Sequence, residues 1–224
     1  MAEVTLAIDT STRVAVGLAR DEKALDSRLL GDARSHVELL TPGIADMLRH
    51  AGLSLADLTR IVVGVGPGPF TGLRVGIATA TTLATALDLP VTGVCSLDVI
   101  ALGHAAREPF LAVLDARRRE VYWARYDATG LRVDGPHVGP LESLPPLPAV
   151  GPGVPSEPGT EPVTLDAGLM AAAMAAPRLQ AVGLEPLYLR APDAELPSTR
   201  KSTIAGGRLR LPLAAPSAPP EVRV

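Results

Sequence analysis

Short apolar runs separated by two segments of helical period fill the first hundred residues of this 224-residue chain. Continuous apolar runs of four to eight residues are typical of buried strands, whereas longer segments with a period near 3.6 favour helices. In chain order the predicted elements are strands at 4–8, 14–19 and 24–30, a helix at 35–51, a strand at 61–65, a helix at 70–87 and a strand at 91–94. Strands joined by helical crossovers predict a mixed sheet of the α/β class.

The second half of the chain opens with a faint copy of the first strand pair. Residues 110–115 and 121–126 have the composition of two strands joined by a turn. Asp9-Thr10-Ser11 and Asp115-Ala116-Arg117 occupy equivalent positions in the two turns. We therefore predict a weak internal repeat of one strand–turn–strand unit.

Proline marks where this pattern is lost. Of the 22 prolines, 17 follow position 135 and nine fall within 136–162, so that stretch can form neither a central strand nor a long helix. We expect it to wrap the surface or to link two elements. The predicted organisation is an N-terminal lobe over 1–106, a degenerate second lobe over 107–204 and a disordered tail over 205–224.

Charge and cysteine content narrow the functional classes. The net charge of −3 and the dispersed basic residues argue against a main RNA-binding surface, and the one dense basic cluster, Arg117-Arg118-Arg119, is interpreted as a solvated turn. A single cysteine, Cys95, permits no internal disulfide. No secretion signal or membrane span is evident, so we expect a cytoplasmic protein without a membrane partner.

A glycine loop and two aspartates are the candidate nucleotide site. Gly66-Pro67-Gly68-Pro69 lies between a predicted strand and a helix, where backbone N–H groups can bind phosphate, although the spacing fits neither a P-loop nor a dinucleotide fingerprint. The aspartates could position Mg²⁺, or could simply bond their own backbone as turn formers. The candidate residues of this vestigial site are Asp9, Ser11, Gly66, Gly68, Thr71, Gly72 and Asp115.

The helix predicted over 70–87 carries only one charge, Arg74. A helix without a charged face is normally covered on both sides, by the sheet on one and by a neighbouring helix or a partner subunit on the other. Small uncharged residues suit a partner interface. Together with the helix at 35–51, the predicted interface residues are Val37, Leu40, Ile44, Val75, Ala78, Thr79 and Thr82.

The sequence contains no motif typical of metal-dependent or nucleophilic catalysis. The four histidines show no His-x-x-x-His spacing, and neither a zinc-protease motif nor a Gly-x-Ser-x-Gly elbow occurs. Cys95 is interpreted as a small buried residue rather than a nucleophile. We therefore predict no catalytic residue, no metal site and no cofactor.

Several segments together resemble the TsaB family. These are residues 6–12, 35–44, 66–76, 114–122 and 185–190, and the resemblance spans roughly residues 4–190. It implies the fold shared by actin, sugar kinases and Hsp70, with two lobes each built on a ribonuclease H-like core. It also implies a place in the machinery that puts threonylcarbamoyl on an adenosine of tRNA.

The role implied by the resemblance is indirect. TsaB resembles its own partner, the transferase subunit TsaD, whose sequences carry a His-x-x-x-His metal pair where this chain has Ser96 and Ile100. The chain also has Pro69 where a serine is usual in the glycine loop. The resemblance therefore implies a non-catalytic subunit that pairs with TsaD and, through it, with the ATPase TsaE, that meets tRNA only indirectly and that forms a homodimer in isolation. The alternatives are an active small-molecule kinase or nucleotide hydrolase of the same fold and, with less support, a metalloprotease.

Overall fold

A computed structural model describes residues 2–31, 36–155, 163–176 and 178–190, and Met1–Ala191 is one compact unit. The tail predicted over 205–224 lies outside the described residues. The elements in chain order are β1 Val4–Asp9, β2 Val14–Arg20, β3 Lys23–Leu30, α1 His36–His50, a 3₁₀ turn Leu55–Asp57, β4 Arg60–Gly64, α2 Phe70–Leu87, β5 Val91–Val94, α3 Ser96–Leu102, β6 Phe110–Asp115, β7 Glu120–Tyr126, β8 Arg132–Pro140, a 3₁₀ turn Leu141–Ser143, β9 Ala149–Val150, α4 Ala167–Ala172 and β10 Ala181–Val182.

The first sheet has the order β10-β5-β4-β1-β2-β3. Strands β1, β2 and β3 pair antiparallel as consecutive hairpins, whereas β4 joins β1, and β5 joins β4, in parallel through the crossover helices α1 and α2. The strand and helix order predicted from the apolar runs is confirmed, as is the mixed α/β class.

The second sheet repeats the first on a smaller scale. Its order, β8-β7-β6-β9, matches β3-β2-β1-β4, and the sense of every pairing is the same: two antiparallel pairs and one parallel pair. Asp9 ends β1 and Asp115 ends β6, so the two predicted turns are equivalent. The internal repeat therefore extends over four strands, although β9 is only two residues long.

The prolines between 136 and 155 lie in peripheral strands and loops. β8 contains Pro136 and ends at Pro140, and it is an edge strand of its sheet. An edge position tolerates proline because the missing N–H faces no partner strand. The prediction that this stretch forms neither a central strand nor a long helix agrees with the described residues.

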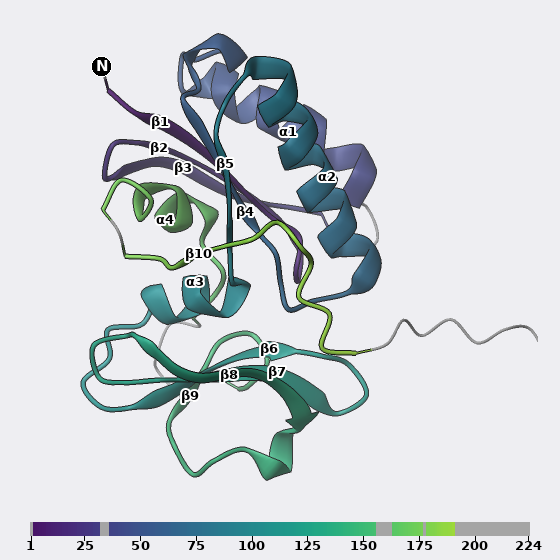
Figure 1. The fold of residues 1–224 in the computed structure, drawn as a ribbon, viewed down its shortest axis with the longest axis vertical. Helices are drawn as coiled ribbons and strands as arrows, with labels where there is room; N and C mark the ends of the chain where they lie inside the picture. The colour runs from purple at the N-terminus through teal and green to yellow at the C-terminus, as the bar shows by residue number, and fades with distance from the viewer. Residues whose placement is uncertain (1, 32–35, 156–162, 177, 191–224) are drawn as a thin grey trace, which may run out of the picture. The chain divides into compact units, whose positions relative to one another are not determined.

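Residue size decides which helix covers which face of the first sheet. Along β2 the large residues Val14, Val16 and Leu18 belong to the core formed with α1 and α2, whereas Ala15 and Ala19 belong to the core formed with α3 and α4. Successive strand side chains point to opposite faces, so this alternation places two helices on each face. Figure 1 shows α1 and α2 on one side of the sheet and α4 on the other.

The core that contains α3 and α4 also contains residues of both sheets. Ala7 and Val62 come from the first sheet, whereas Phe110, Ala112 and Tyr126 come from the second. Helix α4 packs on β1, β2 and β3, and α3 packs on β6, β7 and α4. The two sheets therefore share this one cluster, in addition to the core that the first sheet forms with α1 and α2 and a small cluster on the second sheet.

Candidate functional site

Asp9, the first predicted nucleotide-site residue, is completely buried at the end of β1. The backbone N–H of Ser11 donates to Asp9 Oδ1 over 2.7 Å, and the Ser96 hydroxyl donates to Asp9 Oδ2 over 2.6 Å. The carboxylate fits only because residue 64 is a glycine, since a Cβ at that position would overlap Asp9 Oδ2. The carboxylate thus holds the β1–β2 turn and α3 together, and it has no solvent-exposed surface at which to bind Mg²⁺.

The glycine loop lies against the same turn. Gly66 has φ +103°, a conformation that glycine adopts at little cost. A Cβ on Gly68 would lie 2.6 Å from the Ser11 carbonyl oxygen, so the two backbones are already in van der Waals contact. The Thr10 hydroxyl donates to the Gly72 carbonyl over 2.7 Å. The loop and the turn therefore pack directly on each other, with no gap between them for a phosphate group.

A cleft of about 600 Å³ nevertheless opens beside this turn. It brings together Ser11, Pro69 and Asp115, three residues from the two repeated turns and the glycine loop, with Arg13 and Arg117 among its other lining residues. Asp115 is 55% exposed, and its Oδ1 accepts the Arg117 N–H over 2.8 Å. Of the predicted nucleotide residues, Ser11 and Asp115 line the cleft, whereas Asp9, Gly66, Gly68, Thr71 and Gly72 do not.

Burial raises the pKa of Asp9 above its ordinary value of 3.8, and the hydrogen bonds from Ser11 and Ser96 oppose that rise only in part. A carboxyl whose pKa is higher in the folded state stabilises the fold below its unfolded pKa and loses that contribution as the pH rises through the folded pKa. Ionisation of the buried Asp9 carboxyl therefore destabilises the folded state.

We expect Asp9→Asn to remove this pH dependence. The neutral amide can still accept the Ser11 N–H and does not ionise, so the free energy of unfolding of the variant should not fall as the pH rises through the range in which Asp9 ionises. Urea unfolding of both proteins from pH 4 to pH 8 measures how the free energy of unfolding depends on pH. Asp115→Asn is the control, because it makes the same substitution at an exposed side chain in the equivalent turn of the second sheet. An Asp9→Asn protein with the wild-type pH profile would contradict the prediction.

The sequence analysis did not predict a polar network that is centred on Asp98 of α3. Asp98 is 8% exposed, accepts the Tyr126 hydroxyl at 2.7 Å and forms an ion pair with Arg132 at 3.0 Å. Burial raises the pKa of Asp98, against the lowering effects of Tyr126 and Arg132. Ser96 lies on the same helix as Asp98 and donates its hydroxyl hydrogen bond to Asp9 of β1. Helix α3 therefore links the first sheet to β7 and β8 of the second.

Ser96 and Ile100, which the resemblance described above sets against a histidine pair, are both fully buried on α3. Ile100 belongs to the shared core. Neighbouring Cys95 is buried as well, and desolvation raises the pKa of its thiol to about 12, so the thiol is protonated at neutral pH. Within the described residues no cluster of three or more His, Cys, Asp or Glu side chains could hold a metal ion.

The outward face of α2 is small and almost uncharged. Leu73, Ile77 and Ala80 are buried against the sheet, whereas Ala78 and Thr82 are exposed. Thr71 and Thr85 are also exposed, and Val75 and Thr79 are half-buried. We call this set the α2 face: Thr71, Val75, Ala78, Thr79, Thr82 and Thr85. At its N-terminal end Phe70 stacks on Tyr188, with ring centroids 4.8 Å apart, and the Arg74 guanidinium lies 3.9 Å from the Phe70 ring centroid.

Helix α1 contributes less to this surface than the sequence suggested. Leu40 and Ile44 are only 1% and 3% exposed and belong to the core under α1 and α2. They pack against the sheet, so they are not available to a partner. The side chain of Val37 lies outside the described residues. Of the predicted interface residues, those that reach the surface in the described part of the chain are Val75, Ala78, Thr79 and Thr82, all on the α2 face.

Comparisons with known proteins place the fold and the family. A family model described as "TsaD: tRNA N6-adenosine threonylcarbamoyltransferase" matches residues 32–139. A protein of Mycobacterium tuberculosis is 47% identical over 201 residues, which cover 85% of this chain and 93% of the relative. The tRNA threonylcarbamoyladenosine biosynthesis protein TsaB of Escherichia coli is 37% identical over 124 residues, and that alignment covers 54% of each chain.

Among solved structures, a Pseudomonas aeruginosa protein with similarity to the peptidase YeaZ is 30% identical with a TM-score of 0.67, and the match covers 84% of this chain and all of that one. A second structure, YeaZ from the same organism, is 29% identical with a TM-score of 0.64. The repeated mixed sheets and flanking helices make this chain an actin-like α/β protein of the ribonuclease H-like kind. Within that class, the chain belongs to the TsaB family.

None of the helices formed by the described residues has the length and apolar character needed to cross a membrane.

Proposed function

We propose that this chain is a non-catalytic scaffold subunit in the formation of threonylcarbamoyladenosine on tRNA, and that it pairs with a TsaD-like transferase and, through it, with a TsaE-like ATPase. Relatives at 37% and 33% identity are named for biosynthesis of this modified nucleoside. Their alignments cover about half of each chain.

The observation that carries the proposal is the α2 face. Over its 18 residues α2 has one charged side chain, Arg74, yet Ala78 and Thr82 on its outward side are exposed. Small residues let another helix approach closely, and depletion of charge is typical of the centre of a protein interface. A partner that covers this face removes it from water without burying an unpaired ion.

The family-model match supports a TsaD-like protein as that partner. The matched range, 32–139, includes both α1 and α2. A partner that carries the same pair of helices could meet this chain around a pseudo-twofold axis, with α2 against α2. In its absence the same surface would pair with a second copy of this chain, giving an isologous homodimer.

The environment of Asp9 favours the scaffold over the alternative of an active kinase or nucleotide hydrolase. A carboxylate that positions Mg²⁺ beside a phosphate needs free oxygen lone pairs directed at solvent. Both Asp9 oxygens instead accept hydrogen bonds inside the protein, and the side chain is fully buried. In this proposal tRNA is contacted mainly by the partner.

We expect the purified chain to show neither ATP hydrolysis at an enzyme-like rate nor tRNA modification by itself, and addition of the chain to TsaD and TsaE to restore modification. Reconstitution with and without the chain, with threonylcarbamoyladenosine measured by mass spectrometry, tests both parts. Modification at full rate without the chain would refute the scaffold role. ATP turnover that follows the pure protein and is lost in Asp9→Asn would support the enzymatic alternative.

A further inference from the structure

A cavity of about 390 Å³ lies beside the C-terminal end of α3. Its walls come from α3 and the loop that follows it, from the turn between β7 and β8, and from the segment that precedes β10. None of its described lining residues belongs to the cleft at Ser11 and Asp115 or to the α2 face. Small-ligand sites of proteins typically have volumes of roughly 300–1,000 Å³, so this cavity is large enough to hold a small molecule.

Three side chains on the buried side of the cavity are tied to one another. Tyr126 is 1% exposed, and its hydroxyl donates to Asp98 Oδ1 over 2.7 Å. Arg132 pairs with the same carboxylate, and its Nη1 donates to the Gly135 carbonyl over 3.0 Å. These contacts hold the Arg132 guanidinium in a fixed position, which lowers the entropy cost of binding a ligand to it.

The Arg132 guanidinium keeps hydrogen-bonding capacity that the protein does not use. Its Nε lies 3.0 Å from Asp98 Oδ1, but the contact is poorly aligned, so in the described part of the chain this buried Nε has no hydrogen-bond partner. Nη1 and Nη2 each make one hydrogen bond to a described residue, to Gly135 and to Asp98, so each has a second N–H group to donate. Buried donors normally have a partner, and these unused N–H groups therefore indicate an acceptor in the cavity.

A second cation, Arg178, lines the same cavity from the segment before β10. Arg178 is exposed, and within the described residues its side chain and those of His104 and Gln180 make no hydrogen bond or ion pair. The charged groups of the described lining are two guanidiniums, of Arg132 and Arg178, and one carboxylate, of Asp98. With His104 neutral the net charge of this lining is +1 (2 − 1), which favours an anionic ligand.

We propose that this cavity binds a small organic anion whose carboxylate or phosphate head lies between Arg132 and Arg178. Guanidinium groups bind such heads through charge-assisted, often bidentate hydrogen bonds. The apolar body of the ligand rests on the wall formed by Ala101, Leu102 and Ala106. This binding site is an addition to the proposed scaffold role and does not depend on it.

The first test measures the binding of small probes to the purified full chain by isothermal titration calorimetry. Phenyl phosphate and benzoate each carry an anionic head on an apolar body, whereas inorganic phosphate is a head alone. We expect phenyl phosphate or benzoate to bind saturably below about 10 mM, as ligands of this size do in a formed site, and to raise the Tm. The tighter of the two identifies the head that the site prefers, and inorganic phosphate should bind more weakly than phenyl phosphate.

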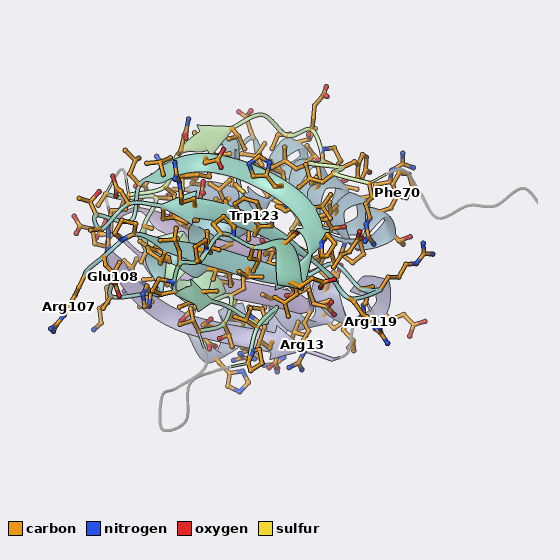
Figure 2. All side chains as sticks on the ribbon, turned by 90° about the horizontal axis from the view of Figure 1, so that it is seen from below. Arg13, Phe70, Arg107, Glu108, Arg119 and Trp123 are labelled. Carbon is orange, nitrogen blue, oxygen red and sulfur yellow. The ribbon has the colours of Figure 1, made fainter. Side chains whose placement is uncertain are left out.

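Arg178→Gln is expected to weaken binding of the tighter probe about tenfold, because it removes the charge-assisted hydrogen bonds of one guanidinium. The matched control is Arg119→Gln, which removes the same charge at an exposed residue beyond the other end of β7. Figure 2 shows Arg107, which directly follows the cavity-lining Ala106, at the opposite side of the view from Arg119. The control should therefore bind the probe like the wild type.

A pair of substitutions at Ala128 tests the charge of the cavity without removing an arginine. Ala128 lines the cavity and is exposed, so both variants should fold with a Tm near that of the wild type. Ala128→Glu brings the net charge of the described lining to zero and competes with the ligand for the guanidiniums, so binding should be lost. Ala128→Gln has nearly the same size without the charge and should retain binding.

Three results would overturn the proposal. The first is the absence of saturable binding of both phenyl phosphate and benzoate. The second is binding that Arg178→Gln and Ala128→Glu leave unchanged, since the anion would then bind outside this cavity. The third is binding of inorganic phosphate as tight as that of phenyl phosphate, since the apolar wall would then contribute nothing. Because every measurement uses the isolated chain, failure of the scaffold role in tRNA modification would leave these results unaffected.

Discussion

Ala78→Glu on α2 is expected to abolish self-association and TsaD binding while the monomer stays folded. Ala78 is exposed in the single chain, so the new carboxylate is solvated and costs the fold little. In an interface through the α2 face the same group would be buried without a partner, which costs several kcal/mol. Thr82→Arg should act in the same way with the opposite charge, and tRNA modification should be lost with either variant.

Three measurements test this prediction: light scattering for self-association, a pull-down for TsaD binding and circular dichroism for folding of the monomer. Ala128→Glu is the matched control, since it places the same side chain at an exposed alanine in the turn between β7 and β8. That variant should pair like the wild type. Normal pairing of a folded Ala78→Glu protein would place the interface elsewhere, for example on the second sheet.

Gly17→Ala is expected to destabilise the fold strongly, although it adds only one methyl group. Gly17 lies on β2 where α4 crosses it, and a Cβ there would overlap the carbonyl group of Ala167 and the amide nitrogen of Gly168. These are backbone atoms that cannot move by a change of rotamer. The cost should reach the upper end of overpacking, about 3 kcal/mol, which corresponds to a fall in Tm of roughly 6–12 °C for a domain of this size.

Differential scanning calorimetry measures this change directly. Gly183→Ala is the control, because a Cβ at Gly183 would meet nothing within 4 Å. It should leave Tm within about a degree of the wild type. A Gly17→Ala protein with wild-type Tm would mean that α4 is not held against β2 as closely as described.

Elements with a clear period were predictable from sequence to within one or two residues. Helix α2 runs from Phe70 to Leu87 as expected, because Pro69 precedes it and Asp88, in the left-handed conformation, ends it. Strands β5 and β6 also have the expected bounds. In each case the local pattern and the tertiary environment favour the same structure, which is why reasoning from sequence works.

Short and fully covered elements were missed for a physical reason. Every residue of α3 from Ser96 to Ala101 is buried, so no polar face reveals a helical period. Helix α4 is six residues long and rich in alanine, and β8 lies among prolines. The network of Asp98, Tyr126 and Arg132 joins residues about thirty positions apart, a proximity that only the fold creates.

The core shared by the two sheets also bears on how the protein unfolds. Ala7 and Ala15 of the first sheet and Phe110 and Tyr126 of the second are buried in the same cluster, with α3 and α4 between them. Loss of either sheet would expose the face that the other now covers, so the shared cluster is closed only when both halves are folded. Unfolding should therefore be a single cooperative transition, and a fragment ending near residue 106 would be prone to aggregate. The second half thus covers the face of the first sheet that lies opposite α1 and α2.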